Sequence, residues 1–258
     1  MRIWWQSSMS LDVDPLWKPY QESLKRHIQE VARQGTTVDV HGVKFVEPLL
    51  ERSNYVRYLN EAQVINNAIT AEREGYDAFC VGCTLDPGLP EIKEVVSIPV
   101  VFLSESCMHL ACILGGKFSL LAFNKHVLLH LTCKVRQYGL EEHLIPSEPF
   151  NLSVVDLPNG FENPDPIIHA IRQAGMEAIA QGTGMFISAC NILNMVLIDC
   201  GCRQIDGVPI LDTAGALVKI TELMVDLEQI GITRSKVGLY TSLSKEELAR
   251  IRKSYGVE

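Results

Sequence analysis

Two cysteines stand at the ends of short apolar runs, and each is followed by a residue with a short hydrogen-bonding side chain. Cys83 follows the run 77–81 and precedes Thr84, and Cys190 ends the run that begins at residue 184 and precedes Asn191. Two thiols on opposite sides of one carbon can racemise it, because one thiolate removes an acidic C–H proton while the other thiol returns a proton to the opposite face. The pair therefore indicates a racemase or epimerase that needs no cofactor.

The elements that must position these cysteines follow an alternation of β-rich runs with amphipathic runs, which predicts a parallel α/β sheet. The predicted strands are 2–5, 36–40, 77–81, 98–103, 117–122, 152–157, 184–189 and 208–211, and the predicted helices are 20–33, 54–74, 91–96, 127–138, 166–180 and 213–227. Functional groups gather at the carboxyl ends of the strands in such sheets. Both cysteines are expected there, with thiol pKa values lowered by helix N-termini.

The alternation restarts after a break at 112–116, where two consecutive glycines stand. The sequence therefore predicts two similar α/β lobes, each a parallel sheet flanked by helices, related by a pseudo-two-fold with the site in the cleft between them. Residues 1–112 are expected to form the N-terminal lobe, which carries Cys83. Residues 113–225 are expected to form the C-terminal lobe, which carries Cys190.

The remaining residues, 226–258, form a C-terminal tail with two recognisable segments. The run 237–240 has the composition of a strand, and Ser244 and Glu247 have the spacing of a capping box that begins a helix. We expect this tail to pack on the N-terminal lobe.

Proton abstraction leaves a planar intermediate with charge on an oxygen, which needs preorganised donors from the loops at the strand ends. Polar side chains follow the predicted strands at these places, and His126 near the loop after 117–122 is a further candidate. The predicted substrate-binding residues are Gln6, Ser7, Ser8, Thr84, Asn124 and Asn191.

The string CTLDPGL at 83–89 resembles the first-cysteine motif of hydantoin racemases in the aspartate/glutamate racemase superfamily, and Ala189-Cys190 resembles the second. The similarity in layout extends from residue 2 to the helix after Asp212. It implies a two-lobed α/β fold, a Cys83/Cys190 acid–base pair at the lobe interface, and a small substrate with an activated C–H bond.

Two loops differ from the family pattern and leave the substrate open. WQSS stands at 5–8 where relatives usually have an Asn-Pro-Asn-like loop, and AFNK stands at 122–125 where they usually offer a threonine. The candidate substrates are a 5-substituted hydantoin and an amino-acid-like acid. Because the superfamily also contains decarboxylases and cis-trans isomerases, a reaction of that kind, with Cys83 or Cys190 as proton donor or nucleophile, is an alternative.

The cysteines also allow other interpretations. Cys80 and Cys83 form a C-x-x-C pair, but Cys80 lies inside a predicted strand, whereas redox pairs of this kind open a helix. Cys80, Cys83, Cys200 and Cys202 together lack the spacing of two zinc knuckles. A two-lobed ligand-binding protein is a further alternative, although it has no need of two thiols at corresponding strand ends.

Composition limits the partners. The chain has 258 residues, 47% of them hydrophobic and 21% charged, and a formal net charge of −8, which suits a globular core and disfavours nucleic acid. No apolar run is long enough for a membrane span. We expect a cytoplasmic homo-oligomer that binds a small-molecule substrate and needs neither a metal nor an organic cofactor, since no Gly-x-Gly-x-x-Gly loop follows the first strand.

Overall fold

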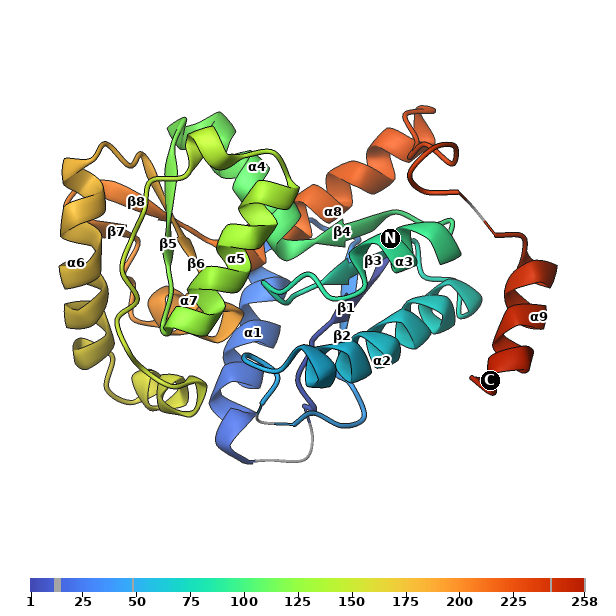
Figure 1. Cartoon of the computed structure of the whole chain (residues 1–258), viewed down its shortest axis with the longest axis horizontal. Coiled ribbons are helices and arrows are strands. Elements are labelled where there is room, and N and C mark those ends of the chain that lie inside the picture. Colours follow the sequence, from blue (N-terminus) through green and yellow to red (C-terminus); the bar gives the residue numbers. More distant parts are fainter. Residues whose placement is uncertain (12–14, 48, 242, 258) are drawn as a thin grey trace.

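The computed structural model describes residues 1–11, 15–47, 49–241 and 243–257, and these residues form two α/β lobes side by side (Figure 1). The strands are β1 (Arg2–Gln6), β2 (Thr37–His41), β3 (Ala78–Val81), β4 (Val100–Phe102), β5 (Phe118–Leu121), β6 (Met185–Ser188), β7 (Gln204–Ile205) and β8 (Val208–Leu211). The α-helices are α1 (Lys18–Val31), α2 (Asn54–Arg73), α3 (Leu89–Val95), α4 (Leu103–Gly115), α5 (Lys125–Gln137), α6 (Asp165–Ala180), α7 (Asn191–Asp199), α8 (Thr213–Gln229) and α9 (Lys245–Tyr255). Short 3-10 helices are η1 (Pro15–Trp17), η2 (Glu141–His143) and η3 (Val154–Phe161).

The sheet of the first lobe has the strand order β2-β1-β3-β4, with every neighbouring pair parallel. The second has the order β5-β6-β8-β7, in which only the short β7 is antiparallel to its neighbour. The strands β1, β3 and β4 thus correspond to β5, β6 and β8. The predicted fold class is confirmed, and Cys83 and Cys190 follow corresponding strands, β3 and β6.

The strand predicted at 152–157 is wrong, because η3 occupies this region. Its β-branched valines favour a strand, but the Ser153 hydroxyl and backbone N–H both bind the Asp156 carboxylate, and this capping arrangement starts a helical turn. Pro158 two residues later cannot donate to a strand ladder. At the edge of β5 that corresponds to the β2 side of β1, the segment after η2 runs parallel to β5 with one bridge, Phe118 to Leu144, in place of a strand at 152–157.

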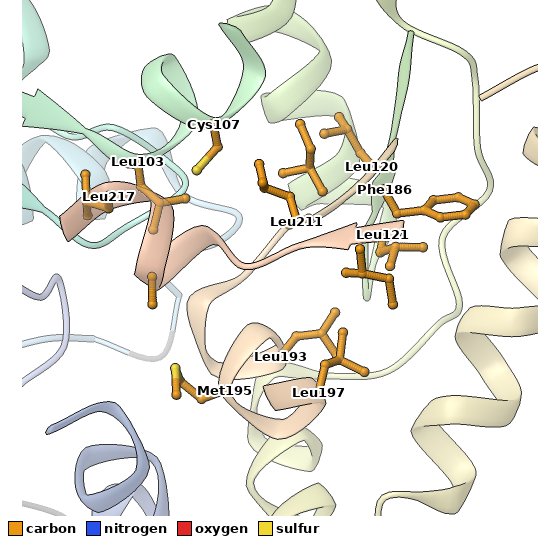
Figure 2. Close-up of a cluster of buried hydrophobic side chains, with 14 of the residues drawn as sticks. Leu103, Cys107, Leu120, Leu121, Phe186, Leu193, Met195, Leu197, Leu211 and Leu217 are labelled. Carbon is orange, nitrogen blue, oxygen red and sulfur yellow. The ribbon is translucent and has the colours of Figure 1, made fainter. Parts of the chain in front are cut away.

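Two helices are exchanged between the lobes. The helix α4 follows β4 of the first sheet but packs against β5 and β6 of the second, and α8 follows β8 of the second sheet but packs against β3 and β4 of the first. The predicted break at 112–116 therefore falls at the end of α4. Apolar side chains from α4, α7, α8 and the second sheet share one cluster, which includes Leu103, Cys107, Leu193, Leu211 and Leu217 (Figure 2).

The helix α1 joins the first lobe to the second through polar contacts along its length. The Ser23 hydroxyl donates to Asp199 at 2.8 Å, and the Arg26 guanidinium binds the same carboxylate. A ring nitrogen of His27 lies 2.6 Å from the carboxylate of Asp212, which also caps α8. These contacts fix the relative position of the lobes and hence the width of the space between them.

The C-terminal segment lies along the first lobe, at the side of the molecule away from the second sheet (Figure 1). Arg234 donates to the carbonyl of Val96, and Arg252 of α9 donates to the side chain of Asn66 in α2. The predicted capping box of Ser244 and Glu247 begins α9. The strand predicted at 237–240 is wrong: these residues form bends outside both sheets, with φ of 87° at Gly238.

Candidate active site

Cys83 lies just beyond the carboxyl end of β3, in a turn closed by a hydrogen bond from the Asp86 N–H to the Cys83 carbonyl at 3.1 Å. The residue before it, Gly82, allows the indole of Trp5 to pack directly against the backbone. A Cβ added at Gly82 would lie 2.3 Å from ring carbons of Trp5. A glycine is therefore required where β3 delivers the cysteine.

Cys190 follows β6 and is the N-cap residue of α7. The extended backbone at this position lets the apolar strand pass directly into the helix. The N–H groups of Ile192 and Leu193, in the first turn of α7, face the thiol. The thiol is thus held at the start of a helix, as expected for a group at the carboxyl end of a parallel strand.

Both cysteines line one cavity of about 350 Å³ between the lobes. Its lining is mostly apolar, and it includes aromatic rings at Trp17, Tyr20, Phe45 and Phe123. The first lobe contributes residues 7–10, 16–17, 20, 44–47, 50–51 and 82–85, and the second contributes 123, 127, 154–155 and 189–192. A cavity of this size and lining suits a small organic molecule.

The thiol pKa values are raised, so the expectation that helix N-termini lower them is wrong for this cavity. Burial raises the pKa of Cys190 to about 12, although the N–H groups of Ile192 and Leu193 act in the opposite direction, and the charge of Cys83 adds to the increase. Burial also raises the pKa of Cys83, against the opposing effects of the Ser8 hydroxyl and the Leu85 N–H. Removal from water outweighs the helix N-terminus because the apolar lining disfavours a charged thiolate.

Thr84 holds the two cysteine loops together. Its hydroxyl donates to the carbonyl of Ala189, the residue before Cys190, at 2.8 Å, and its own carbonyl accepts from the Ser104 hydroxyl at 2.6 Å. Thr84 lines the cavity, but its hydroxyl is used within the protein. Its donor therefore fixes the position of Cys83 relative to Cys190.

Gln6, Asn124 and His126 do not line the cavity. The Gln6 side chain is fully buried, where it accepts from the Trp4 indole and donates to the carbonyl of Ser7. The Asn124 carbonyl oxygen caps α5, and its NH₂ group donates to Glu51 of the opposite lobe at 3.0 Å. His126 is exposed on the first turn of α5. Asn124 thus reaches the site only through Glu51, which does line the cavity.

Ser7, Ser8 and Asn191 line the cavity, and two of them present polar atoms without a hydrogen-bond partner among the described residues. These atoms are the side-chain oxygen of Asn191 and the Ser8 hydroxyl, which acts on the Cys83 thiol and lowers its pKa but makes no hydrogen bond of normal geometry. The NH₂ group of Asn191 donates to the Tyr20 hydroxyl at 3.1 Å. The Ser7 hydroxyl accepts from the Met9 N–H at 3.1 Å, which shapes the loop after β1. Ser8 and Asn191 therefore offer the cavity one hydroxyl and one amide oxygen.

Several residues that line the cavity carry no signal in the sequence. Tyr20 is in a helix and reaches the site only because α1 lies between the lobes. Phe45 and Glu51 lie in the loop between β2 and α2. The side-chain amide of Gln63 holds this loop in place by two hydrogen bonds to the backbone of Phe45. No motif marks this loop, although its position after a parallel strand is a general signal for a site.

The remaining thiols lie elsewhere. Cys80 is fully buried in β3, where burial raises its pKa to about 12, and the hydroxyl that faces it is that of Thr221 in α8. Cys80 therefore points to the α8 side of the sheet and not into the cavity.

In the described part of the chain, no three His, Cys, Asp or Glu side chains gather as a metal site would require. None of the described helices combines the length and apolar composition of a membrane crossing.

The fold and cavity define a two-lobed α/β protein in which two cysteines, one from each lobe, line a single cavity. The family model described as Asp/Glu/Hydantoin racemase matches residues 19–221, so the chain belongs to this family and is a racemase, an isomerase. The hydantoin racemase of Pseudomonas sp. (strain NS671) is 28% identical over 235 residues, which are 91% of each chain, and that of Paenarthrobacter aurescens is 28% identical over 88% of this chain and 93% of its own. The allantoin racemase of Pseudomonas fluorescens has the same fold, with a TM-score of 0.79, 23% identity and coverage of 94% of this chain and 97% of its own.

Proposed function

We propose that this racemase acts on 5-substituted hydantoins without a cofactor, with Cys83 and Cys190 as its two proton-transfer groups. The observation that carries the proposal is that both thiols line one cavity, each from a different lobe and each after a corresponding strand. A carbon held between them is accessible to one thiol on each face. The hydantoin racemases among the relatives support this choice of substrate.

The charge coupling between the thiols suits the proposed chemistry. Abstraction needs one thiolate, and delivery of a proton to the other face needs one neutral thiol. Ionised Cys83 raises the pKa of Cys190, so the first ionisation disfavours the second. A thiolate at one cysteine therefore disfavours a second thiolate at the other, and a single thiolate is the favoured charged state.

The unpaired polar atoms of the cavity match a cyclic amide. In one step, a thiolate takes the C5 proton and the C5–H electron pair moves into the ring, with negative charge developing on the adjacent carbonyl oxygen. In the next, the electrons return to C5 as the opposite thiol gives up its proton. The Ser8 hydroxyl can donate to a ring carbonyl, and the Asn191 side-chain oxygen can accept a ring N–H.

The charges around the cavity favour a neutral substrate over an amino dicarboxylate. The described lining residues include Lys44, Glu47 and Glu51 but no arginine. Glu51 acts on the Cys190 thiol and raises its pKa, so its charge is felt inside the cavity. A carboxylate on the substrate would meet the same repulsion, and the apolar side chains suit an apolar 5-substituent instead.

Hydrogen–deuterium exchange in deuterated water tests the two-thiol mechanism with a 5-substituted hydantoin such as the 5-benzyl compound. Overall racemisation cannot separate the thiols, because the enantiomers have equal free energy and kcat/KM must be the same in both directions. We therefore expect Cys83→Ser and Cys190→Ser each to abolish racemisation. Each variant should still exchange the C5 proton of one enantiomer, and the two variants should act on opposite enantiomers. NMR of each pure enantiomer measures this exchange, with the uncatalysed rate subtracted.

Cys200→Ser is the matched control, since Cys200 is also partly buried but does not line the cavity, and it should leave both exchange rates unchanged. Full racemisation by Cys190→Ser alongside an inactive Cys83→Ser would contradict the two-thiol mechanism. Racemisation would then need Cys83 and a second proton-transfer group other than Cys190. If the unmodified chain neither exchanges nor racemises hydantoins, a one-cysteine reaction, such as decarboxylation or cis-trans isomerisation through a Cys83 adduct, is the better account. Saturable binding of the hydantoin with no exchange in the unmodified chain would indicate a ligand-binding protein.

A further inference from the structure

Asp86 of the CTLDPGL string has no part in the proton transfers described above, yet it lies in the turn that carries Cys83. Its side chain is 1% exposed, and its backbone has φ of 45°. Both features are costly for an aspartate, because a buried carboxylate loses its hydration and a non-glycine residue is disfavoured in the left-handed region. The surrounding contacts must therefore over-determine this conformation.

Three donors hold the carboxylate. One oxygen accepts from the Ser104 N–H at 2.9 Å, and the other accepts from the Glu105 N–H at 2.8 Å and the Tyr138 hydroxyl at 2.6 Å. The two N–H groups belong to the first turn of α4, where helix N–H groups have no partner within the helix. Asp86 therefore ties the Cys83 turn to the start of α4.

The third donor links the turn to the second lobe, because Tyr138 is the C-cap residue of α5. The Thr84 hydroxyl makes the other link, to the carbonyl before Cys190. The turn carrying Cys83 is thus attached to the opposite lobe on both sides of the loop residue Leu85. A turn held in this way fixes the direction and reach of its thiol.

We propose that Asp86 is a positioning residue for Cys83: its carboxylate holds the Cys83 turn against α4 and Tyr138, and so sets the reach of this thiol across the cavity from Cys190. The three carboxylate contacts act on the Cys83 turn directly, whereas the Cys190 loop meets this turn only through the Thr84 hydroxyl. The proposal rests on the two-thiol mechanism proposed above.

The ionisable groups that face Asp86 act on it from several elements. Burial raises its pKa to about 7, while Tyr138 and the two N–H groups of α4 act to lower it, as does Lys134 of α5. Ionised Asp86 in turn raises the pKa of Cys83 in the same turn and of Cys107 in α4. Replacing Asp86 by a neutral residue therefore removes a charge that disfavours the Cys83 thiolate.

The test places Asp86→Asn in two backgrounds that each retain one proton-transfer thiol, Cys190→Ser and Cys83→Ser. With Cys83 as the working thiol, we expect hydantoin C5 exchange to fall on the order of tenfold to a hundredfold, because a small misplacement of a reacting group has that effect. With Cys190 as the working thiol, exchange should change less than about twofold, within the range of an indirect effect. Equal losses in both backgrounds, or no loss in either, would overturn the proposal.

A second readout does not depend on turnover. Alkylation of Cys83 by iodoacetamide, mapped by mass spectrometry as a function of pH in the Cys190→Ser background, should have a lower midpoint in Asp86→Asn. If Cys83 ionises more readily while hydantoin exchange is slower, the thiol is misplaced. A lowered exchange rate with an unchanged alkylation midpoint would contradict the effect of the Asp86 charge on the Cys83 thiol.

Tyr138→Phe keeps the proposal testable if Asp86→Asn does not fold, because it removes one donor and leaves the carboxylate in place. We expect hydantoin exchange to fall more in the Cys190→Ser background, where Cys83 is the working thiol, than in the Cys83→Ser background, and to fall less than it does with Asp86→Asn. An equal fall in both backgrounds overturns the proposal. The parent one-thiol variants report on the proposed function separately. If they do not show exchange of opposite enantiomers, the two-thiol mechanism itself fails, whatever Asp86→Asn does.

Discussion

Thr84→Val removes the hydrogen bond that joins the two cysteine loops while keeping the shape of the side chain. The hydroxyl donates to the carbonyl of Ala189 at 2.8 Å, and both residues are buried. The replacement leaves a buried carbonyl without this donor, which costs about 1–3 kcal/mol. We expect the free energy of unfolding to fall by this amount.

The activity should change in a way that separates this role from substrate binding. Because the hydroxyl is already used within the protein, its loss should leave KM within about twofold but lower kcat about tenfold or more, since the thiols are no longer held at a fixed separation. Thr84→Ser keeps the donor and serves as the matched control.

Urea unfolding followed by tryptophan fluorescence measures stability, and polarimetry of a resolved 5-substituted hydantoin measures racemisation. If Thr84→Val unfolds at the same urea concentration as the unmodified protein while KM rises about tenfold, the hydroxyl binds substrate and the structural reasoning is refuted. A loss of stability that Thr84→Ser shares would instead point to the methyl group.

The remaining predictions concern pH and the glycine before Cys83. Because burial raises the pKa of Cys83, and that of Cys190 to about 12, the single thiolate becomes more populated as pH rises, and kcat/KM for racemisation should increase up to about tenfold per pH unit between pH 7 and 9. A flat profile over this range would show that ionisation of a thiol does not limit the reaction. Gly82→Ala should abolish racemisation and lower the midpoint of thermal unfolding, because the new Cβ would lie 2.3 Å from the Trp5 ring. If Gly82→Ala keeps its racemisation activity and its unfolding midpoint, the Trp5 indole can move aside.

The sequence predicted the placement of the cysteines because the signals for it are local. An apolar run followed by Cys83 and a Pro-Gly turn indicates the end of a buried strand, and a second apolar run ends at Cys190. The carboxyl ends of parallel strands then meet at one edge by topology alone. A local pattern also predicted the capping box that begins α9.

The roles of individual polar residues could not be read in the same way, because they depend on contacts between distant segments. Thr84 and Asn124 have side chains suited to a substrate, but the Thr84 hydroxyl donates to the carbonyl of Ala189 in the other lobe and the Asn124 amide donates to the carboxylate of Glu51. The exchange of α4 and α8 between the sheets has no local signal either. The pKa direction of the thiols was misjudged for a related reason, since burial is a property of the assembled cavity.

The raised thiol pKa values and the apolar cavity belong to one chemical arrangement. A proton moves easily between two groups only when neither holds it far more strongly than the other, and a carbon acid is a weak acid. A thiol whose pKa is raised by burial becomes a stronger base once it has lost its proton, and so approaches the affinity of the carbanion for that proton. The same burial makes few thiolates available in the empty site.

The N–H groups at the start of α7, the Ser8 hydroxyl and the Leu85 N–H offset part of this effect for the two thiols. The balance between apolar lining and these few donors, rather than a strongly acidic thiol, is what suits the cavity to a neutral, weakly acidic substrate.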